Sequence, residues 1–426
     1  MRKEKDLFRL RTILLANGER LPLLCSSLTG EPLYEPLLYA LTELRATNKA
    51  VNTLRQALRA IQLLQLVLQE LDVDLSARLA GGQSLALAEV EAVARAASLT
   101  MDELADEDEA PSPMNVFRLE AARARDQART FDEVAPGTKS IRLHYIRHYL
   151  DWLAKSTLLR LDPVKPVFGA LRMSSQVVSA TLRERMPGTG SRNTENAREG
   201  LAPDELARVK QVIAVDSTEN PWKGRHNRVR NNLMVRWYQL VGVRRAELLN
   251  VRVSDINFQR CEVLVARRPD APDDPRKEQP LVKTADRSFP VDPELLADTH
   301  NYIRTQRRSL PGARKHGYLF VAYPTGRPLS LSAVNLVFQQ LRTRDGLPNT
   351  LSPHVVRHSW NDAFSDYADK EGLSPEVERK TRARAMGWSE TSETAAKYTR
   401  RHTRRKSRES LIQMQEKLVK GARDET

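Results

Sequence analysis

SPHVVRHSW, residues 352–360, places a histidine and an arginine three positions apart behind a serine and a proline. Pro353 suits the first turn of a helix, and Ser352 is a side chain of the type that caps the position before it. On such a helix His354 and Arg357 share one face, because residues three apart are neighbours on a helix surface. An imidazole and a guanidinium near a helix N-terminus, where backbone N–H groups point outward, indicate a site for an anion.

Upstream of this stretch, VGVRRAEL (241–248) offers a second guanidinium at the end of an apolar run. Arg244 is followed three residues later by Glu247, and on a helix this carboxylate would orient the arginine. Arginine is always charged, and its planar fork of donors matches phosphate oxygens. A surface arginine is the commoner role for any single residue of this type, so the pair matters only together with its neighbours.

A lysine and two aromatic residues complete the set. Lys283 lies in VKTADRSFPVD (282–292), in the turn between two predicted strands, with Lys277 as the competing lysine. Trp388 lies in MGWSET (386–391), and its indole N–H can donate to a phosphoryl oxygen.

Tyr398, in AAKYTRRH (395–402), adds a phenol to this order. Together these residues can hold a phosphodiester, stabilise its developing charge, attack it and protonate the leaving oxygen. His358 is interpreted as a packing or supporting residue.

The bulk composition favours a polyanionic partner. The chain of 426 residues has 68 Lys+Arg against 54 Asp+Glu, which gives a net charge of +14, and its pI is near 9.8. Such a surplus is typical of nucleic-acid-binding proteins. Cys25 and Cys261 form neither a disulfide framework nor a zinc-binding spacing, and no apolar run is long enough for a membrane span. We expect a cytoplasmic protein, associated with the nucleoid when bound to DNA, that needs no metal or other cofactor.

Most of the chain has helical periodicity. A helix is predicted over 37–75, where apolar residues from Val51 to Leu68 recur at three and four positions, and further helices are predicted over 85–99, 114–130, 138–156, 201–214 and 228–240 and across most of 293–418. Short strands are predicted over 261–268, 279–283 and 287–291. The acidic stretch 102–109 indicates an exposed loop, and 1–34 show no clear pattern.

The stretch from 201 to 402 resembles the catalytic domain of the tyrosine recombinase (phage integrase) family. The family's first box has the form T-G-L-R-x-x-E-L, and here Val241 stands for the threonine. HVVRH matches the family's H-x-L-R-H, and MGWS matches its L-G-H-S, with Trp388 at the histidine position. Tyr398 follows at the usual spacing. Lys283 is preferred to Lys277 because KTADRSFP is similar to the family's run into the next helix.

This resemblance implies strand exchange by transesterification. Tyr398 would attack a phosphodiester and form a 3′-phosphotyrosyl bond, while Arg244, Arg357, His354 and Trp388 surround the phosphorane. Lys283 would be the general acid for the 5′-oxygen. The covalent intermediate conserves the bond energy, so the reaction would require neither ATP nor a metal.

The implied fold is mainly α with a small antiparallel β-sheet (α+β). The expected parts are a helical core DNA-binding domain over 36–186, an interdomain linker over 187–200, the catalytic domain over 201–408 and a C-terminal helix over 409–426 that packs in trans on a neighbouring subunit. Residues 1–35 are expected to be either an arm-type DNA-binding segment or part of the core-binding domain.

The implied partner is double-stranded DNA at specific recombination sites, bound by a homo-oligomer that is a tetramer on two sites. Basic clusters over 222–252 and 399–408 would neutralise phosphates. The expected DNA-binding residues are Arg225, Arg228, Arg230, Arg245, Arg400, Arg401, Arg404 and Arg405. An integrase of a bacterial mobile element, aided by an accessory or directionality protein, is the favoured function. A type IB topoisomerase-like enzyme and a non-catalytic DNA-binding accessory protein are the alternatives.

Overall fold

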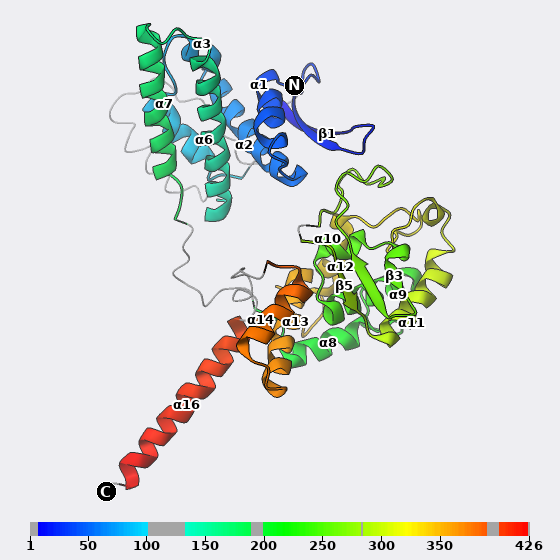
Figure 1. Cartoon of the computed structure of the whole chain (residues 1–426). Coiled ribbons are helices and arrows are strands. Elements are labelled where there is room, and N and C mark those ends of the chain that lie inside the picture. Colours follow the sequence, from blue (N-terminus) through cyan, green and yellow to red (C-terminus); the bar gives the residue numbers. More distant parts are fainter. Residues whose placement is uncertain (1–6, 101–132, 189–198, 283, 390–399, 425–426) are drawn as a thin grey trace. The chain divides into compact units, whose positions relative to one another are not determined.

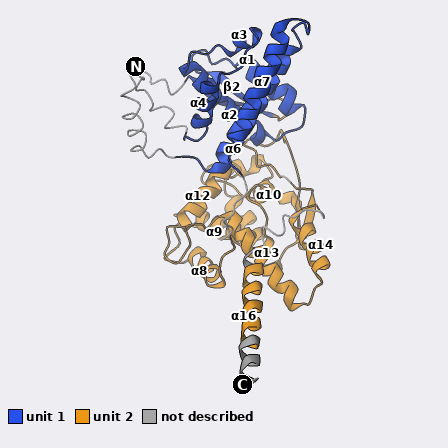
Figure 2. Ribbon diagram, turned by 90° about the vertical axis from the view of Figure 1, so that its left-hand side faces the viewer, with its two compact units in different colours: residues 1–15, 20–194 blue, residues 16–19, 195–426 orange. Residues whose placement is uncertain are grey.

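The computed structural model describes residues 7–100, 133–188, 199–282, 284–389 and 400–424 (Figure 1). The chain forms two compact units, Met1–Leu15 with Arg20–Thr194 and Ala16–Glu19 with Glu195–Thr426 (Figure 2). Helices make up most of the described residues, and the strands form small antiparallel sheets. The predicted fold class is therefore confirmed. The acidic stretch 102–109, the predicted helix over 114–130 and most of the predicted linker lie outside the described residues.

The first unit is built around α2 (Val51–Glu70), whose apolar face is buried as the periodicity predicts. Burying a leucine or isoleucine side chain stabilises the fold by roughly 1.5–3 kcal/mol, so this one face contributes much of the core. Both α2 and α7 pack against α6, and Figure 1 shows α6 and α7 side by side. The helical segments of this unit are α1 (Tyr34–Tyr39), η2 (Ala40–Arg45), α2, α3 (Leu75–Ala80), α4 (Leu87–Ala96), α6 (Pro136–Leu158) and α7 (Pro166–Glu184).

A β-hairpin occupies the N-terminal stretch that the sequence leaves unassigned. Strand β1 (Phe8–Leu14) pairs antiparallel with β2 (Arg20–Ser26), and the hairpin packs on α2. In the turn, Asn17 Oδ1 accepts a hydrogen bond from the backbone N–H of Glu19 at 3.0 Å, and Gly18 has a φ of +87°. Asparagine and glycine favour such a turn, because they tolerate or stabilise its backbone conformation. Residues of β2 are almost continuously buried, so this strand lacks the polar–apolar alternation that identifies strands in a sequence.

The second unit has α9 (Arg225–Val241) at its centre. Trp237 is fully buried on α9, and its indole N–H donates to Thr299 Oγ1 of α11 at 3.1 Å. The helix α13 packs against α9. The other helical segments are α8 (Pro203–Ile213), α10 (Arg245–Asn250), η4 (Val253–Asp255), α11 (Pro293–Tyr302), η5 (Ile303–Arg307), η6 (Pro311–Lys315), α12 (Leu331–Leu341), α13 (Pro353–Lys370), α14 (Pro375–Met386) and α16 (Arg400–Asp424).

The sheet of this unit has the order β3–β4–β5 and is antiparallel throughout. Its strands are β3 (Ile256–Asn257), β4 (Glu262–Val265) and β5 (Arg287–Pro290), so two of the predicted strands are confirmed. The prediction of a strand over 279–283 is wrong for 279–282, which have no strand conformation. The partner of β4 on this side is β5, and in the connection before it Arg276 Nη1 donates to the carbonyls of Leu249 and Leu329 at 3.0 and 3.1 Å.

The helix predicted at the C-terminus is part of the longer helix α16, which begins at Arg400. Its first turns lie against α13, where His402 Nε2 and Lys406 Nζ are 2.8 and 2.9 Å from Asp369 Oδ2. Arg405 pairs with Asp366 of α13. Further along α16, the apolar side chains of Leu411, Ile412 and Met414 are exposed.

Candidate active site

Arg244 is positioned by the junction between α9 and α10. The helix α9 ends at Gly242, which has a φ of +65°, and a Cβ there would lie 2.7 Å from the Trp360 side chain of α13. Arg244 then caps α10: its backbone N–H donates to Glu247 Oε2 at 2.8 Å, and its Nη1 donates to Glu247 Oε1 at 3.0 Å. The contact between Arg244 and Glu247 that the spacing predicts is therefore present.

The helix α13 presents the histidine–arginine pair. Ser352 Oγ accepts from the Val355 N–H at 3.3 Å and Pro353 begins the first turn, so the predicted cap is confirmed. His354 is exposed, whereas Arg357 is only 1% exposed. His358 is buried one turn further on, with its ring centroid 4.8 Å from that of His354.

The two arginines converge on the C-terminal turn of α14. Arg244 Nη1 and Arg357 Nη2 donate to the carbonyl oxygen of Met386 at 3.2 and 3.4 Å, and Arg357 Nη1 also donates to Gly242 O at 2.5 Å. The guanidinium carbon of Arg357 lies 5.7 Å from the centroid of the Trp388 ring. Arg244 and Arg357, distant in the sequence, thus meet at one carbonyl group, with Trp388 beside Arg357.

Glu247 is the buried anion at the centre of this arrangement. It is 1% exposed, and besides Arg244 it receives hydrogen bonds from Arg287 Nη2 at 3.0 Å and Thr284 Oγ1 at 2.9 Å. Arg357 Nη1 lies 3.8 Å from Glu247 Oε2. Three guanidinium groups therefore surround one carboxylate.

The charge of Glu247 is maintained by these neighbours. Burial acts to raise the pKa of Glu247, but the positive charges of Arg287 and Arg357, with the backbone N–H and charge of Arg244, lower it to about 2. The carboxylate is therefore ionised at neutral pH and holds the arginines in fixed positions.

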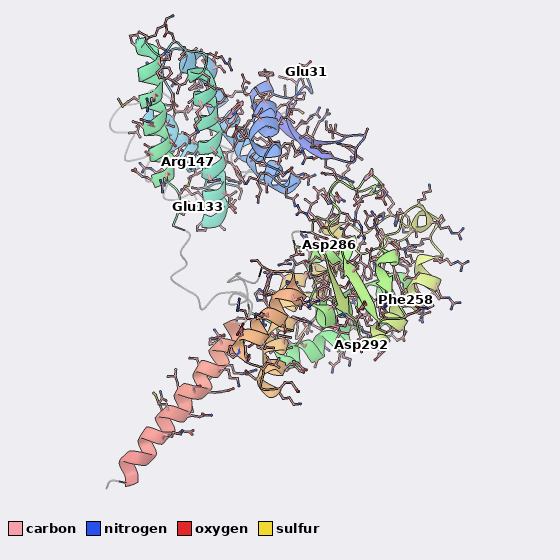
Figure 3. All side chains as sticks on the ribbon, in the orientation of Figure 1. Glu31, Glu133, Arg147, Phe258, Asp286 and Asp292 are labelled. Carbon is pink, nitrogen blue, oxygen red and sulfur yellow. The ribbon has the colours of Figure 1, made fainter. Side chains whose placement is uncertain are left out.

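Sequence reasoning missed Arg287 and Thr284 as members of this cluster. Both belong to the KTADRSFP run, which served only to choose between two lysines. Arg287 is the first residue of β5, directly after Asp286 (labelled in Figure 3), whose Oδ1 accepts from the Arg267 N–H at 2.6 Å. A basic residue at a strand start carries no signal of burial, so only the fold reveals its position.

Two of the predicted catalytic residues, Tyr398 and Lys283, lie outside the described residues. Lys277 is exposed on the connection between β4 and β5, beside the buried Arg276. The preference for Lys283 over Lys277 therefore stays a prediction.

Among the predicted DNA-binding arginines, Arg230 requires a correction. It is 6% exposed, and its side chain donates to Asn231 Oδ1 and, at 3.0 Å, to Val321 O, so it stabilises the interior of the second unit instead of facing a ligand. Arg228 is half-buried and donates to the carbonyls of Trp222 and Val215 at 2.9 and 3.1 Å.

The remaining arginines of that prediction differ in their surroundings. Arg225 is exposed, with Asp216 at 3.7 Å, and Arg245 is half-buried and bonded to Asn335 Oδ1. Arg404 and Arg405 are exposed and paired with Glu199 and Asp366. The side chains of Arg400 and Arg401 lie outside the described residues.

A groove of about 480 Å³ lies between α6 and α7 of the first unit. Four basic side chains line it, among them Arg147, which is labelled in Figure 3. It contributes no residue to the arginine cluster of the second unit. In the part of the chain that the structure describes, no group of three or more His, Cys, Asp or Glu side chains is placed to hold a metal ion. The described helices also include none with the length and apolar character of a membrane span.

Comparisons with known proteins match residues of the second unit. Residues 207–405 match the model of the phage integrase family. The chain is 21% identical over 225 residues to the tyrosine recombinase XerC of Proteus mirabilis, a match that covers 53% of this chain and only 58% of that relative. It is 25% identical over 230 residues to the tyrosine recombinase XerD of Halalkalibacterium halodurans, covering 52% of this chain and 67% of the relative. Residues 207–405 of this chain therefore form a domain of the phage integrase family.

A solved structure, the XerH site-specific recombinase bound to a palindromic difH substrate, is also similar. The superposition covers 74% of this chain and 87% of that chain, with 13% identity and a TM-score of 0.42.

Proposed function

We propose that this protein is a site-specific tyrosine recombinase, an integrase that cuts and rejoins double-stranded DNA. In this reaction the Tyr398 hydroxyl attacks a phosphodiester, a 3′-phosphotyrosyl bond forms, and the 5′-oxygen leaves as a hydroxyl after taking a proton from Lys283. Attack by the freed 5′-hydroxyl of another strand on the phosphotyrosyl bond then restores the phosphodiester and releases the tyrosine.

The observation that carries this proposal is the convergence of Arg244 and Arg357 beside Trp388. The Arg244 side chain is 26% exposed, and its guanidinium donates to Glu247 Oε1 and Met386 O through Nη1. Its Nε and Nη2 have no hydrogen-bond partner among the described residues, so these donors are available to phosphate oxygens. Donors fixed before the substrate arrives cost no reorganisation in the transition state, which is why such an arrangement accelerates phosphoryl transfer.

His354 fits the same function, because it is exposed at the N-terminus of α13, one turn from Arg357. Its imidazole can exchange a proton with the tyrosine or hold a phosphoryl oxygen. The nucleophile, the lysine and the cationic side chains supply the chemistry of both steps, so we expect neither ATP nor a metal to be required.

The partner and the assembly belong to the same proposal. We assign residues 36–186 to core DNA binding, 187–200 to a linker, 201–408 to catalysis and 409–426 to a C-terminal helix that packs on a neighbouring subunit of a tetramer. The exposed apolar side chains of α16 support this packing. The hairpin on α2 supports the assignment of residues 1–35 to the core-binding domain. Recombination sites of a bacterial mobile element are the proposed substrate, with a directionality protein as a further partner.

Trapping of the covalent intermediate tests the proposal. On nicked suicide substrates in excess EDTA, the wild-type protein should form an adduct that survives a denaturing gel, and Tyr398→Phe should form none while it still binds DNA. The substitution removes the nucleophilic oxygen and changes no charge. An adduct with the variant, or a strict need for Mg²⁺, would contradict the mechanism. Relaxation of supercoiled plasmids regardless of sequence would instead identify a topoisomerase.

A further inference from the structure

We propose that Arg287 is a positioning residue that ties the start of β5 and the C-terminal turn of α14 to Glu247 and thereby fixes Arg244 for cleavage. This inference rests on the proposed function. It assigns a role to a residue that would touch neither the DNA nor the attacking tyrosine.

All three nitrogens of the Arg287 guanidinium are engaged within the protein. Nη2 donates to Glu247 Oε2 at 3.0 Å, Nη1 to Thr284 Oγ1 at 2.7 Å, and Nε to the carbonyl of Ala385 at 3.0 Å. The side chain is only 8% exposed, and its guanidinium carbon lies 4.7 Å from the centroid of the Phe289 ring. Arg287 is therefore a buried connector between three segments.

The carboxylate of Glu247 transmits this connection to Arg244. Oε2 accepts from the Arg244 N–H and from Arg287, while Oε1 accepts from Arg244 Nη1 and from Thr284. The rotation of this carboxylate is thus set from one side by Arg287 and Thr284. Loss of either contact would release the carboxylate and, with it, the guanidinium that we propose contacts the phosphate.

A second observation comes from Gly387, at the C-terminus of α14. A Cβ on this residue would lie 2.8 Å from Arg287 Nη1 and 2.8 Å from Thr284 Cβ. The turn that leads to Trp388 therefore packs directly on the Arg287–Thr284 pair. A change in either side chain is expected to displace the turn whose Met386 carbonyl both Arg244 and Arg357 contact.

Arg276 provides a matched control, because it is an equally buried arginine of the same connection. Its guanidinium bonds to Asp274, Leu249 O and Leu329 O. A substitution of Arg276 thus removes a buried arginine and keeps Arg287, Thr284 and Glu247, the residues of the proposed path to Arg244, unchanged.

The test measures single-turnover cleavage by folded protein, with DNA affinity and thermal unfolding in parallel. Arg287→Met and Arg287→Lys should each slow cleavage by roughly a hundredfold, the loss expected for a misplaced catalytic group, with unchanged DNA affinity. Lysine at position 287 should not restore the cleavage rate, because one ammonium group cannot bridge three segments in the geometry of the guanidinium. Arg276→Met should lower the melting temperature and leave the cleavage rate of the folded fraction near wild type.

A double-mutant cycle separates positioning from general loss of structure. If Arg287 acts through Glu247, then Arg287→Met should slow cleavage far less in a Glu247→Gln background than in the wild type. If the Arg287 variants do not fold, Thr284→Val and Thr284→Ser provide the same comparison: valine should slow cleavage and serine, which keeps the hydroxyl, should not.

The inference would be overturned if Arg287→Lys cleaved at the wild-type rate. It would also be overturned if Arg287→Met slowed cleavage equally with and without Glu247. In both cases the wild-type adduct would still support the proposed function. Equal rates for the two Thr284 variants would overturn it as well. Absence of any adduct with the wild-type protein would refute the proposed function itself.

Discussion

At the scale of single residues, the site is a buried carboxylate with arginines around it. Glu247 makes no proposed contact with DNA, yet the orientation of Arg244 depends on it. Removing one partner of a buried ion pair is costly, because the other charge is left uncompensated. We therefore expect substitution of Glu247 to lower both the free energy of unfolding and the cleavage rate. The effect on the free energy of unfolding should depend on pH.

The pH dependence of unfolding should show the contribution of Glu247. Its pKa is about 2 in the folded protein against an ordinary value of 4.5, so it stabilises the fold above pH 4.5 and loses this effect as the pH falls toward 2. The full contribution is on the order of 3 kcal/mol. The difference in unfolding free energy between wild type and Glu247→Gln should narrow steadily from pH 5 to pH 3. Urea titrations followed by tryptophan fluorescence would measure it, and a gap that stays constant would contradict the assignment.

The sequence alone identifies much of this site but not how it is held together. The helix capped by Ser352 and the contact of Arg244 with Glu247 were predictable, because local spacing determines which residues share a helical face. Arg287 was not, because its role depends on the meeting of β5 with α10 and α14, which no local pattern encodes. Arg230 was misjudged for a related reason: a basic residue in a charged helix is expected to face solvent, and the fold buries it.

At the scale of elements, helix ends set the positions of the proposed catalytic side chains. The helices α9 and α14 are both followed by a glycine with a φ of +65°. Arg244 comes two residues after the first glycine, and Trp388 comes directly after the second. The hairpin and the connection before β5 were harder to predict. Strand β2 of the hairpin is almost continuously buried and so lacks the alternation that identifies strands, and residues 279–282 are apolar in part but have no strand conformation.

The glycine at the end of α14 can be tested against a natural control. Gly387 and Gly372 both have a φ of +65°, but a Cβ at Gly372 would meet nothing within 4 Å. Alanine at either position should cost about 1–2 kcal/mol for the left-handed backbone. Only Gly387→Ala should also slow single-turnover cleavage, because its Cβ would push on Arg287 and Thr284. Equal cleavage rates in the two variants would show that the turn tolerates the displacement.

At the scale of the whole molecule, α16 has two different parts. Its first turns are fixed to α13 by ion pairs with Asp366 and Asp369, whereas Leu411, Ile412 and Met414 further along are exposed. An apolar face of this kind is normally covered, and a neighbouring subunit is the proposed cover.

Deleting residues 409–426 should therefore reduce assembly and leave the catalytic domain folded. The expected result is normal binding of one protomer to a single site but loss of tetramers on paired sites, measured by mass photometry. The ion-paired first turns remain in this deletion. An insoluble or unfolded product would show instead that the helix covers its own subunit.

The ion pairs along the first turns of α16 have a consequence for how the chain would respond to salt. Arg404, Arg405 and Lys406 each already lie beside a carboxylate of Glu199, Asp366 or Asp369. These carboxylates act as counterions of the basic side chains. Because they are part of the protein, they are not released into solution when DNA binds. Fewer mobile ions should therefore be displaced than there are basic residues. The fall of log affinity with log salt concentration should then be shallower than the number of basic residues predicts. Neutralising Asp366 and Asp369 would then steepen that slope and strengthen binding to any DNA, so these acids would restrain attachment to unrelated sequences.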